Sequence, residues 1–371
     1  MGTKIELAER TGRYDTVAHD LVAMIADDSV RNGVEPVLIL SVLDASALAL
    51  NGKPYLEEAR QLAKGYIAAA KDANVAIING ETAELGRRVG GFGSAPYMDE
   101  QAHRFIAAHL NGDNWEGIRA LCDYLGEQDM EKKKDLLSRM GQEEIEFIKR
   151  MESLRTLNFN WSGTAIGFAR EDRLITGQGI VPGESIVGLR EIGFRSNGLS
   201  LVRKVLRDAY GEDWHLQLLH GKTLGETVLQ PSQIYTPTVV DMFGGYEGEE
   251  KVHISGIAHI TGGGIPEKLG RILALSNRGL GVVIDNPFIV PHIMRHVQQQ
   301  GKVPDREAYR SWNMGHGMLI VTPDPLKAIS VALEHGIDAK KVGHVTEDST
   351  IRILNQGMFS SSEPELAFSV S

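Results

Sequence analysis

The sequence has 371 residues, a net charge of −10, 42% hydrophobic and 24% charged residues. This is the composition of a globular protein with room for one large or two ordinary domains, because domains usually contain ~100–200 residues. The acidic balance excludes a generic binder of nucleic acid or anionic membrane, since no extended basic stretch is available to meet phosphates. The longest apolar runs fall far short of the ~20 residues that span a bilayer.

Cysteine and glycine contents add two further limits. A single cysteine, Cys122, excludes an internal disulfide and any multi-cysteine metal site. Since no signal peptide is visible, we expect a reducing, cytoplasmic location. Glycine is enriched, with 41 residues against a usual share of ~7%, which indicates tight turns and weakly suggests phosphate-binding loops.

The first half of the chain has a mixed α/β pattern. Residues 34–43 are a continuous apolar run of strand length, and residues 54–73 have the apolar spacing of a helix. Residues 74–80 then read as a second strand, whose end is a usual place for ligand-binding loops in α/β folds. Amphipathic helical patterns fill residues 94–158, which we interpret as a helical insertion. A pattern typical of a strand resumes at Thr164.

A Gly- and Pro-rich stretch at residues 176–185 is the best candidate for a domain boundary. Beyond it, strand patterns alternate with helical patterns in a second α/β unit. The strand patterns cover residues 185–190, 279–285, 317–322 and 340–346; the helical patterns cover residues 197–210, 231–245, 265–273, 287–301 and 325–336. We therefore predict an N-terminal domain over residues 1–175, a C-terminal domain over residues 176–356 and a Ser-rich flexible tail over residues 357–371.

Three consecutive glycines, Gly262, Gly263 and Gly264, separate a strand-like segment from a helical pattern. Glycines let backbone N–H groups point at one spot, and a helix N-terminus adds partial positive charge. With Thr261, the segment therefore predicts a phosphate-binding loop. The alternative is a tight turn that needs glycine only for its backbone conformation. His259, just upstream, remains open to a structural or a catalytic role.

Carboxylates gather near the N-terminus. Asp20, Asp27 and Asp28 lie in one short segment, where a cation such as Mg²⁺ would relieve their repulsion. The alternative is a solvated acidic face. Lys4 is a candidate partner for a phosphate, or simply an N-terminal lysine.

Two further groups of polar residues could serve either a ligand or only the fold and surface. Glu81 and Glu84 follow the second predicted strand. Arg195, Ser196 and Asn197 precede a predicted helix, where Ser196 or Asn197 would serve as the N-cap. The functional alternative is that these three side chains form a second polar pocket facing a ligand.

Taken in order, several segments resemble the consecutive motifs of one family. They are GTK, HDLVAM, DDSVRNGVEPV, NGETAEL, SNGLSLVRKVL, LQPSQIY, HITGGGIPEKLGRIL and WNMGHGM. The family is that of aminoimidazole ribonucleotide (AIR) synthetase, or phosphoribosylformylglycinamidine cyclo-ligase, and the resemblance covers most of residues 1–93 and 159–346. It implies an α/β fold of two domains, with an N-terminal sheet or barrel at a homodimer interface and a C-terminal α/β sandwich.

The resemblance also implies an activity. The protein would use ATP and Mg²⁺ to close the ring of formylglycinamidine ribonucleotide, giving aminoimidazole ribonucleotide in purine biosynthesis. Phosphoryl transfer of this kind depends mostly on positioning and charge neutralisation, which suits a sequence with no evident nucleophile. Two alternatives stay open: another ATP-using phosphotransferase of the same superfamily, or a truncated, catalytically weak nucleotide-binding homologue.

Site residues follow from the matched motifs. The resemblance assigns ATP contacts to Lys4, Asp20 and Glu81, and metal contacts to Asp20 and Asp28. It assigns catalytic roles to Asp28, Asn197 and His259. The substrate and phosphate contacts would be Arg195, Ser196, Asn197, Thr261, Gly262, Gly263, Gly264 and Asn313, the last of which could instead cap a turn.

The sequence also departs from the family pattern. Arg195 stands where many members have histidine, and Asp27 replaces the asparagine of an Asn-Asp pair. Arginine cannot shuttle a proton near neutral pH, but it could clamp a phosphate or carboxylate. The sequence opens at MGTK, where the family has a preceding glycine-rich segment and an aspartate, so ATP closure and metal binding are expected to be weaker. Residues 94–158 have no recognised counterpart.

Overall fold

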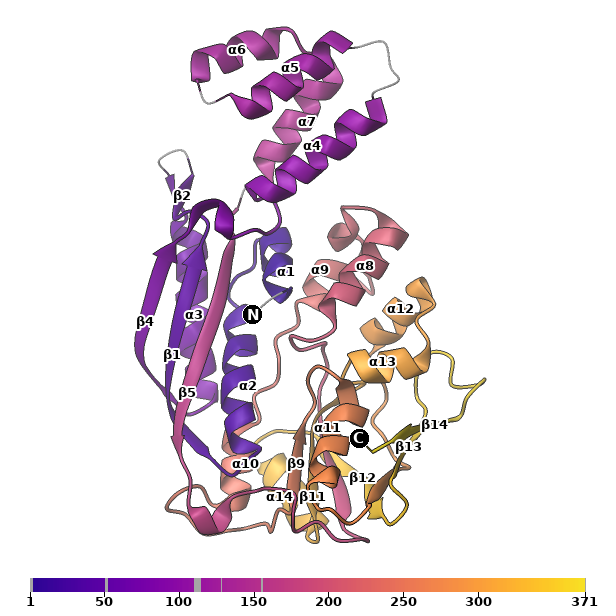
Figure 1. The fold of residues 1–371 in the computed structure, drawn as a ribbon. Coiled ribbons are helices and arrows are strands. Elements are labelled where there is room, and N and C mark those ends of the chain that lie inside the picture. The colour runs from indigo at the N-terminus through magenta and orange to yellow at the C-terminus, as the bar shows by residue number, and fades with distance from the viewer. Residues whose placement is uncertain (1–2, 51–52, 110–114, 128, 155, 371) are drawn as a thin grey trace. The chain divides into compact units, whose positions relative to one another are not determined.

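The computed structural model describes residues 3–50, 53–109, 115–127, 129–154 and 156–370 (Figure 1). The chain divides into two compact units. The larger one comprises Met1–Val42, Glu57–Glu81 and Trp161–Ser371, and the smaller one Leu43–Leu56 and Thr82–Asn160. Within the described ranges, no helix combines the length and the apolar character needed to cross a membrane.

The larger unit begins with two helices that the sequence patterns did not predict, α1 (Lys4–Thr11) and α2 (Val17–Val30). Helix α2 is buried on most of its surface, including the carboxylates of Asp20 and Asp27. Because Asp20 and Asp27 are buried together with the apolar residues, α2 has no clear polar face, and its periodicity is hard to recognise.

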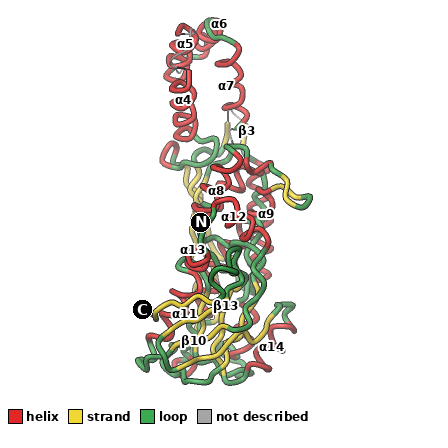
Figure 2. Tube along the Cα trace, turned by 90° about the vertical axis from the view of Figure 1, so that its right-hand side faces the viewer, coloured by secondary structure: helices red, strands yellow, loops and turns green. Residues whose placement is uncertain are grey.

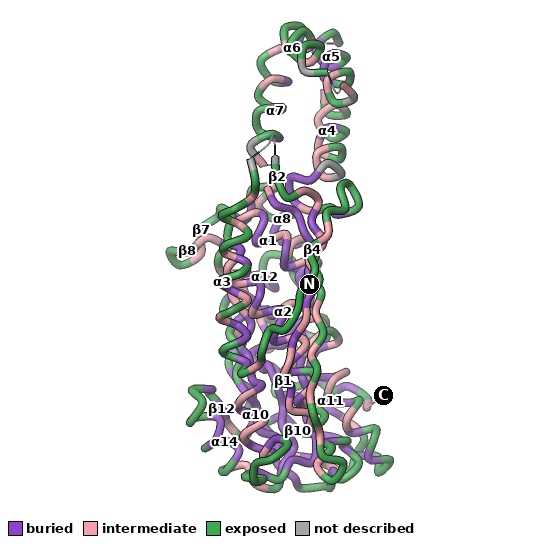
Figure 3. Tube along the Cα trace, turned by 90° about the vertical axis from the view of Figure 1, so that its left-hand side faces the viewer, coloured by how far each residue is buried: buried purple, intermediate pink, exposed green. Residues whose placement is uncertain are grey.

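A three-stranded sheet follows, in the order β4–β1–β5. Its strands are β1 (Glu35–Ala45), β4 (Ala76–Glu84) and β5 (Phe159–Phe168). The two strands predicted at 34–43 and 74–80 are confirmed, as is the helix predicted at 54–73, which is α3 (Leu56–Asp72). Strand β5 starts before the predicted Thr164. Edge strand β4 is exposed along almost its whole length (Figure 3).

The described residues of the smaller unit form four helices where the sequence predicts a helical insertion; Figure 2 labels them. They are α4 (Ala95–His109), α5 (Trp115–Gly126), α6 (Met130–Ser138) and α7 (Gln142–Ser153), beside the short strands β2 (Ala49–Leu50) and β3 (Lys53–Pro54) and the turn η1 (Gly86–Arg88). Leu121 and Ile148 are central to a hydrophobic cluster of these helices. Cys122 is exposed on α5. The unit therefore has a core of its own.

A seven-stranded sheet organises the C-terminal part of the larger unit, in the order β14–β13–β10–β12–β6–β11–β9. Its strands are β6 (Ser185–Arg190), β9 (Gly256–His259), β10 (Gly281–Ile284), β11 (His316–Thr322), β12 (Ala339–Thr346), β13 (Thr350–Leu354) and β14 (Glu365–Ser369). Strand β11 pairs antiparallel with β6 and β9, whereas β10 and β13 are parallel. The side chains of β11 are all buried, which is typical of a sheet covered on both faces.

Helices and short turns complete this part of the unit. They are η2 (Glu171–Arg173), α8 (Leu199–Tyr210), η3 (Trp214–Leu216), α9 (Leu224–Val228), α10 (Thr236–Phe243), α11 (Gly264–Ala274), α12 (His292–Gly301), α13 (Asp305–Ser311) and α14 (Pro325–Glu334), with a hairpin of β7 (Leu218–Leu219) and β8 (Lys222–Thr223). Helix α10 starts later than the predicted residue 231 because Pro237 sits in its first turn, where proline is favoured.

The chain end differs from the predicted flexible tail. Residues Glu365–Ser369 form β14, which pairs antiparallel with β13. Leu366 and Phe368 alternate into the core, and this period of two is the pattern of a half-buried strand. The α/β fold class is confirmed, while the predicted domain boundary at residues 176–185 stays a prediction.

Candidate functional site

The centre of the candidate site is a buried arginine. Arg195, in the loop between β6 and α8, is only 2% exposed. Its Nη1 donates to Glu191 Oε2 and to the Gln233 carbonyl, both at 2.9 Å. Its Nη2 donates to Asp27 Oδ2 at 3.0 Å and to His259 Nε2 at 2.9 Å. These bonds hold the guanidinium inside the protein, so the geometry does not favour the predicted direct contact with substrate.

The two carboxylates beside the arginine are themselves fixed. Asp27 Oδ1 accepts hydrogen bonds from the Tyr235 amide at 3.0 Å and from Thr236 Oγ1 at 2.9 Å. Burial raises the pKa of Glu191, although Arg195 acts in the opposite direction. The two departures from the family pattern, Arg195 and Asp27, are therefore direct partners in one buried ion pair.

His259, at the end of β9, connects this network to an exposed carboxylate. Its Nδ1 lies 2.9 Å from Asp28 Oδ1. The imidazole is fully buried, while the Asp28 side chain is 55% exposed. Burial lowers the pKa of His259, and Arg195 lowers it further. Burial raises the pKa of Asp28, but the bond from His259 and the nearby cations outweigh this effect and lower it overall.

A second buried ion pair joins α1 and α2. Lys4 Nζ donates to Asp20 Oδ1 at 2.7 Å and to the Gln230 carbonyl at 2.6 Å, and both charged side chains are fully buried. The hydroxyls of Ser196 and Ser232 also donate to Asp20 Oδ1. Asp20 Oδ2, in contrast, has no hydrogen-bond partner among the described residues. Such an orphaned buried oxygen is unusual, and it fits a bound cation or ligand donor.

The spacing of Asp20 and Asp28 limits how they could hold a metal ion. They lie eight positions apart on α2, a rise of ~12 Å along the helix axis, so one ion cannot touch both. The described part of the chain contains no cluster of three or more potential metal ligands. Magnesium usually binds through one or two carboxylates and substrate phosphates, so these residues fit only a site that the substrate completes.

The three glycines that follow β9, of which Gly264 is the first residue of α11, divide into two kinds. Gly263 and Gly264 have φ values of 93° and 62°, and a Cβ at Gly264 would lie 2.0 Å from the Tyr309 carbonyl oxygen. The Gly264 amide donates to the Thr261 carbonyl at 3.0 Å. These two positions therefore match the alternative of a tight turn.

Gly262 differs from its neighbours because nothing in the fold demands glycine there. It is exposed, its φ is not positive, and a Cβ would have Asn197 Oδ1 as its nearest neighbour, at 3.8 Å. Across the described residues, the Gly262 and Gly263 amides have no backbone hydrogen-bond acceptor. The Glu267 carboxylate lies against Gly263, so an incoming phosphate would require it to move. The open glycine face and Asn197 form the part of the loop that a ligand could approach.

Asn313 and Glu81 are the two remaining predicted site residues. Asn313 Nδ2 donates to the Gly193 carbonyl at 2.8 Å and its Oδ1 accepts from the Gly315 amide at 2.9 Å. These two bonds match the alternative that Asn313 caps a turn. Glu81 is exposed on β4, a different element from the α2 helix that carries Asp20 and Asp28.

Sequence reasoning missed several residues that build the site. Glu191, Ser232 and Tyr235 hold Arg195, Asp20 and Asp27 in place. Ser232 and Tyr235 fall in the LQPSQIY motif and could have been singled out from it, whereas no pattern marks Glu191.

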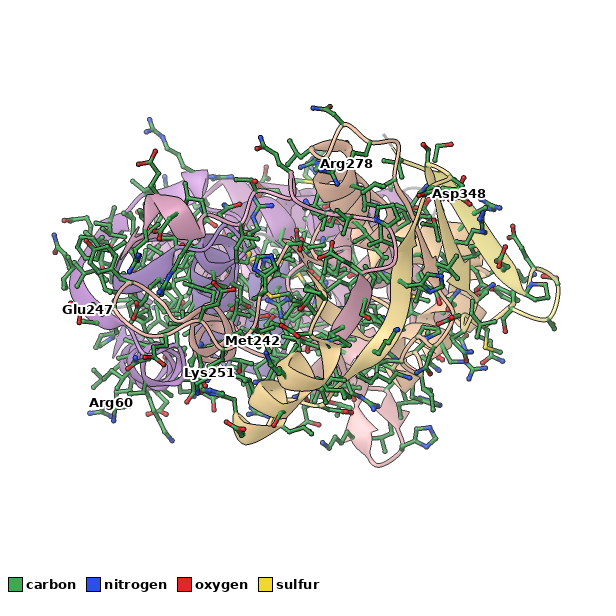
Figure 4. The ribbon with its side chains drawn as sticks, turned by 90° about the horizontal axis from the view of Figure 1, so that it is seen from below. Arg60, Met242, Glu247, Lys251, Arg278 and Asp348 are labelled. Carbon is green, nitrogen blue, oxygen red and sulfur yellow. The ribbon has the colours of Figure 1, made fainter. Side chains whose placement is uncertain are left out.

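A cavity of about 1060 Å³ opens elsewhere, against the loop of residues 244–251. Glu247 and Lys251 of its wall are labelled in Figure 4. None of the predicted site residues lines it, so cavity size does not locate the candidate site.

Comparison with known proteins identifies a family by sequence. The AIR synthase related protein N-terminal domain model matches residues 1–95, and the C-terminal domain model matches residues 181–354. A phosphoribosylformylglycinamidine cyclo-ligase of Methanocaldococcus jannaschii is 30% identical over 350 residues, which are 94% of this chain and 76% of that protein. The chain belongs to the AIR synthase-related family. The predicted family is thereby confirmed.

The fold is also similar to that of a solved structure, a HypE–HypF complex. This complex matches with a TM-score of 0.52 at 15% identity, covering 96% of this chain and 84% of that one. Thermotoga maritima PurL complexed with FGAR gives a TM-score of 0.48 at 13% identity, with 96% of this chain covered. This chain spans only 42% of that PurL chain. At such low identity the likeness to HypE shows the fold alone.

Proposed function

We propose that this protein catalyses the ATP-dependent ring closure of formylglycinamidine ribonucleotide to aminoimidazole ribonucleotide, with release of ADP and phosphate. The observation that carries the proposal is the 30% identity, over 94% of the chain, to a protein named as that cyclo-ligase. The open face of Gly262 beside Asn197, together with the exposed carboxylate of Asp28, supports a site for a phosphorylated ligand near the loop between β9 and α11.

The chain's own residues would act by positioning. Asn197 and the Gly262 amide would bind the ribonucleotide, and Asp28 would present its carboxylate at the ATP phosphates. Mg²⁺ would neutralise phosphate charge when bound; because one ion cannot touch both carboxylates, Asp20 and Asp28 would each hold a separate ion together with substrate phosphates. Lys4 would act through Asp20, since its ammonium is bound to that carboxylate. Such an arrangement needs no covalent protein group.

A cytoplasmic homodimer is part of the same proposal. Strand β4 presents a nearly fully exposed edge. Ile78 of β4 and Ile166 and Phe168 of β5 are 52%, 44% and 56% exposed. Unprotected strand edges with apolar side chains readily pair with another chain. We expect Ile78→Lys to shift the protein to a monomer in analytical ultracentrifugation, and an unchanged dimer, or a monomeric wild type, would contradict this assignment.

An assay with formylglycinamidine ribonucleotide, ATP and Mg²⁺ tests the activity. Formation of aminoimidazole ribonucleotide with one equivalent of ADP is the expected result. ADP production that requires some other acceptor would instead indicate a phosphotransferase. Ligand binding without any turnover would indicate a binding protein, and either result would overturn the proposal.

Replacement of Gly262 by valine tests whether a ligand approaches the loop. Because no atom of the protein lies closer than 3.8 Å to the new Cβ, we expect an unchanged melting temperature. A ligand that approaches the backbone there would lose contact, and KM would rise about tenfold, which corresponds to ~1.4 kcal/mol. Gly179→Val is the matched control, since a Cβ there meets no atom within 4 Å and the position lies outside the loop. Equal KM values for both variants would remove the loop from the site.

Replacement of Asn197 by alanine tests the division between the two substrates. We expect the KM for the ribonucleotide to rise more than the KM for ATP, because the Asn197 side chain lies beside Gly262, whereas the contact of this loop with Asp20 comes from Ser196. Steady-state kinetics with each substrate varied in turn gives the comparison. Equal losses for the two substrates, with the fold intact by circular dichroism, would contradict the assignment.

A further inference from the structure

The hydrogen bonds of Arg195 use all of its terminal donors. Nη1 carries two N–H groups and has two acceptors, Glu191 Oε2 and the Gln233 carbonyl, at 2.9 Å each. Nη2 also carries two, and its partners are Asp27 Oδ2 at 3.0 Å and His259 Nε2 at 2.9 Å. A guanidinium has no lone pair to accept a hydrogen bond. The contact with His259 is therefore possible only if Nε2 is the acceptor.

This requirement determines where the imidazole carries its proton. In a neutral imidazole one ring nitrogen accepts and the other donates. Since Nε2 accepts from Arg195, Nδ1 carries the hydrogen, and it lies 2.9 Å from Asp28 Oδ1. We propose that Arg195 is a positioning residue that fixes His259 in its Nδ1–H tautomer and thereby directs the ring proton to Asp28.

The guanidinium is held firmly enough to impose this choice. Glu191 Oε1 accepts from the Ile192 amide at 3.0 Å, and its Oε2 accepts from the Gln233 amide at 3.2 Å. Asp27 Oδ1 is bound by Tyr235 and Thr236, so neither carboxylate is free to turn. The Tyr235 ring also lies 5.3 Å from the guanidinium carbon. Arg195 thus approaches His259 from one fixed direction.

The other charged neighbours of His259 do not compete for its nitrogens. Asp27 Oδ2 lies 3.9 Å from Nε2, beyond hydrogen-bond distance, and already accepts from Arg195. Arg31 and Lys268 affect Asp28 by charge, and the Nε of Arg31 is 3.5 Å from Asp28 Oδ1. Arg195 and Asp28 are therefore the two groups that orient the ring.

The consequence for Asp28 rests on the proposed function. Its Oδ1 accepts a hydrogen bond from His259 Nδ1–H, while more than half of the side chain faces solvent. The carboxylate is thus held in one rotamer with its exposed part available to a ligand. His259 itself is fully buried and touches no open surface, so its role is to hold Asp28 and not to exchange a proton with substrate.

The tautomer can be observed directly, without turnover. In ¹⁵N-histidine-labelled protein at neutral pH, two-bond ¹H–¹⁵N spectra distinguish Nδ1–H from Nε2–H rings. His259→Gln identifies the His259 signals among the 12 histidines. We expect His259 to be an Nδ1–H ring in wild type and to remain so in Asp28→Asn. An Nε2–H ring, or an average of both tautomers, in wild type would overturn the proposal.

Arg195→Lys separates positioning from simple charge. Lysine keeps the positive charge between Asp27 and Glu191 but cannot reproduce the planar four-donor geometry. We expect the His259 tautomers to mix and kcat to fall at least tenfold, with KM for the ribonucleotide changed less than threefold. Arg190→Lys is the matched control, because Arg190 is 41% exposed and pairs with Asp338. An unchanged tautomer in Arg195→Lys contradicts the proposal, whereas a protein without turnover contradicts only the proposed function.

Discussion

Replacement of Arg195 by methionine is expected to lower the free energy of unfolding by about 3–5 kcal/mol. The arginine is enclosed with two fully buried carboxylates, Asp27 and Glu191, at 3.0 and 2.9 Å. Removing one partner of a buried ion pair leaves uncompensated charge in a region that water does not reach. Denaturant unfolding followed by circular dichroism measures the change.

Two further variants make this expectation specific. Arg190→Met removes an exposed arginine paired with Asp338, and should cost less than about 1 kcal/mol. Adding Asp27→Asn to Arg195→Met should recover part of the lost unfolding free energy. The second substitution removes the negative charge of Asp27, which Arg195→Met leaves buried without a partner. A loss below 1 kcal/mol for Arg195→Met, or no recovery in the double variant, would show that this network does not stabilise the fold.

Acidification is expected to destabilise the protein through His316. This histidine is fully buried on β11, and burial lowers its pKa from 6.5 to about 4. The unfolded chain therefore binds a proton that the folded protein rejects, so stability is complete above pH 6.5 and is lost as the pH falls towards 4. A shift of this size, at ~1.4 kcal/mol per unit, amounts to about 3 kcal/mol. Protonation would also break the bond from the Phe288 amide to Nε2.

The measurement is a set of unfolding free energies from pH 7 to 4 for wild type and His316→Asn. The variant will be less stable at neutral pH, but its pH dependence should be shallower by as much as ~1.4 kcal/mol per pH unit. Other histidines with lowered pKa, such as His259 and His215, act in both proteins and cancel in the comparison. Exposed His253 provides the control substitution, with an expected slope equal to that of wild type. Parallel curves for wild type and His316→Asn would contradict the expectation.

Sequence patterns predicted the fold best where periodicity is simple. The apolar run at 34–43 and the helical spacing at 54–73 correspond to β1 and α3. Helix α2 was not predicted because its buried residues include both apolar side chains and the carboxylates of Asp20 and Asp27, which removes a clear polar face. The Ser-rich composition of the chain end concealed the alternating pair Leu366 and Phe368 that forms β14.

Only some of the site residues could be predicted from the sequence. The order of the motifs indicates a family, but it does not show which side chains are already hydrogen-bonded inside the protein. The sequence analysis predicts substrate contacts for both Asn197 and the glycine loop, and the structure places Asn197 Oδ1 beside Gly262. It could not show that Arg195 and Asp27, 168 positions apart, bind each other in the interior. Nor could it distinguish Gly262, which the fold leaves unconstrained, from Gly264, where the Tyr309 carbonyl excludes a Cβ.

The lone thiol of the protein provides a practical consequence. Cys122 is exposed on α5, and the sequence contains no other cysteine. A maleimide dye added to the native protein will therefore attach at one known point, without prior mutagenesis. Because α5 belongs to the smaller unit, the emission anisotropy of that dye would report the tumbling of the four-helix segment. Comparison of this anisotropy with and without ATP would show directly whether nucleotide binding changes the motion of that part of the molecule.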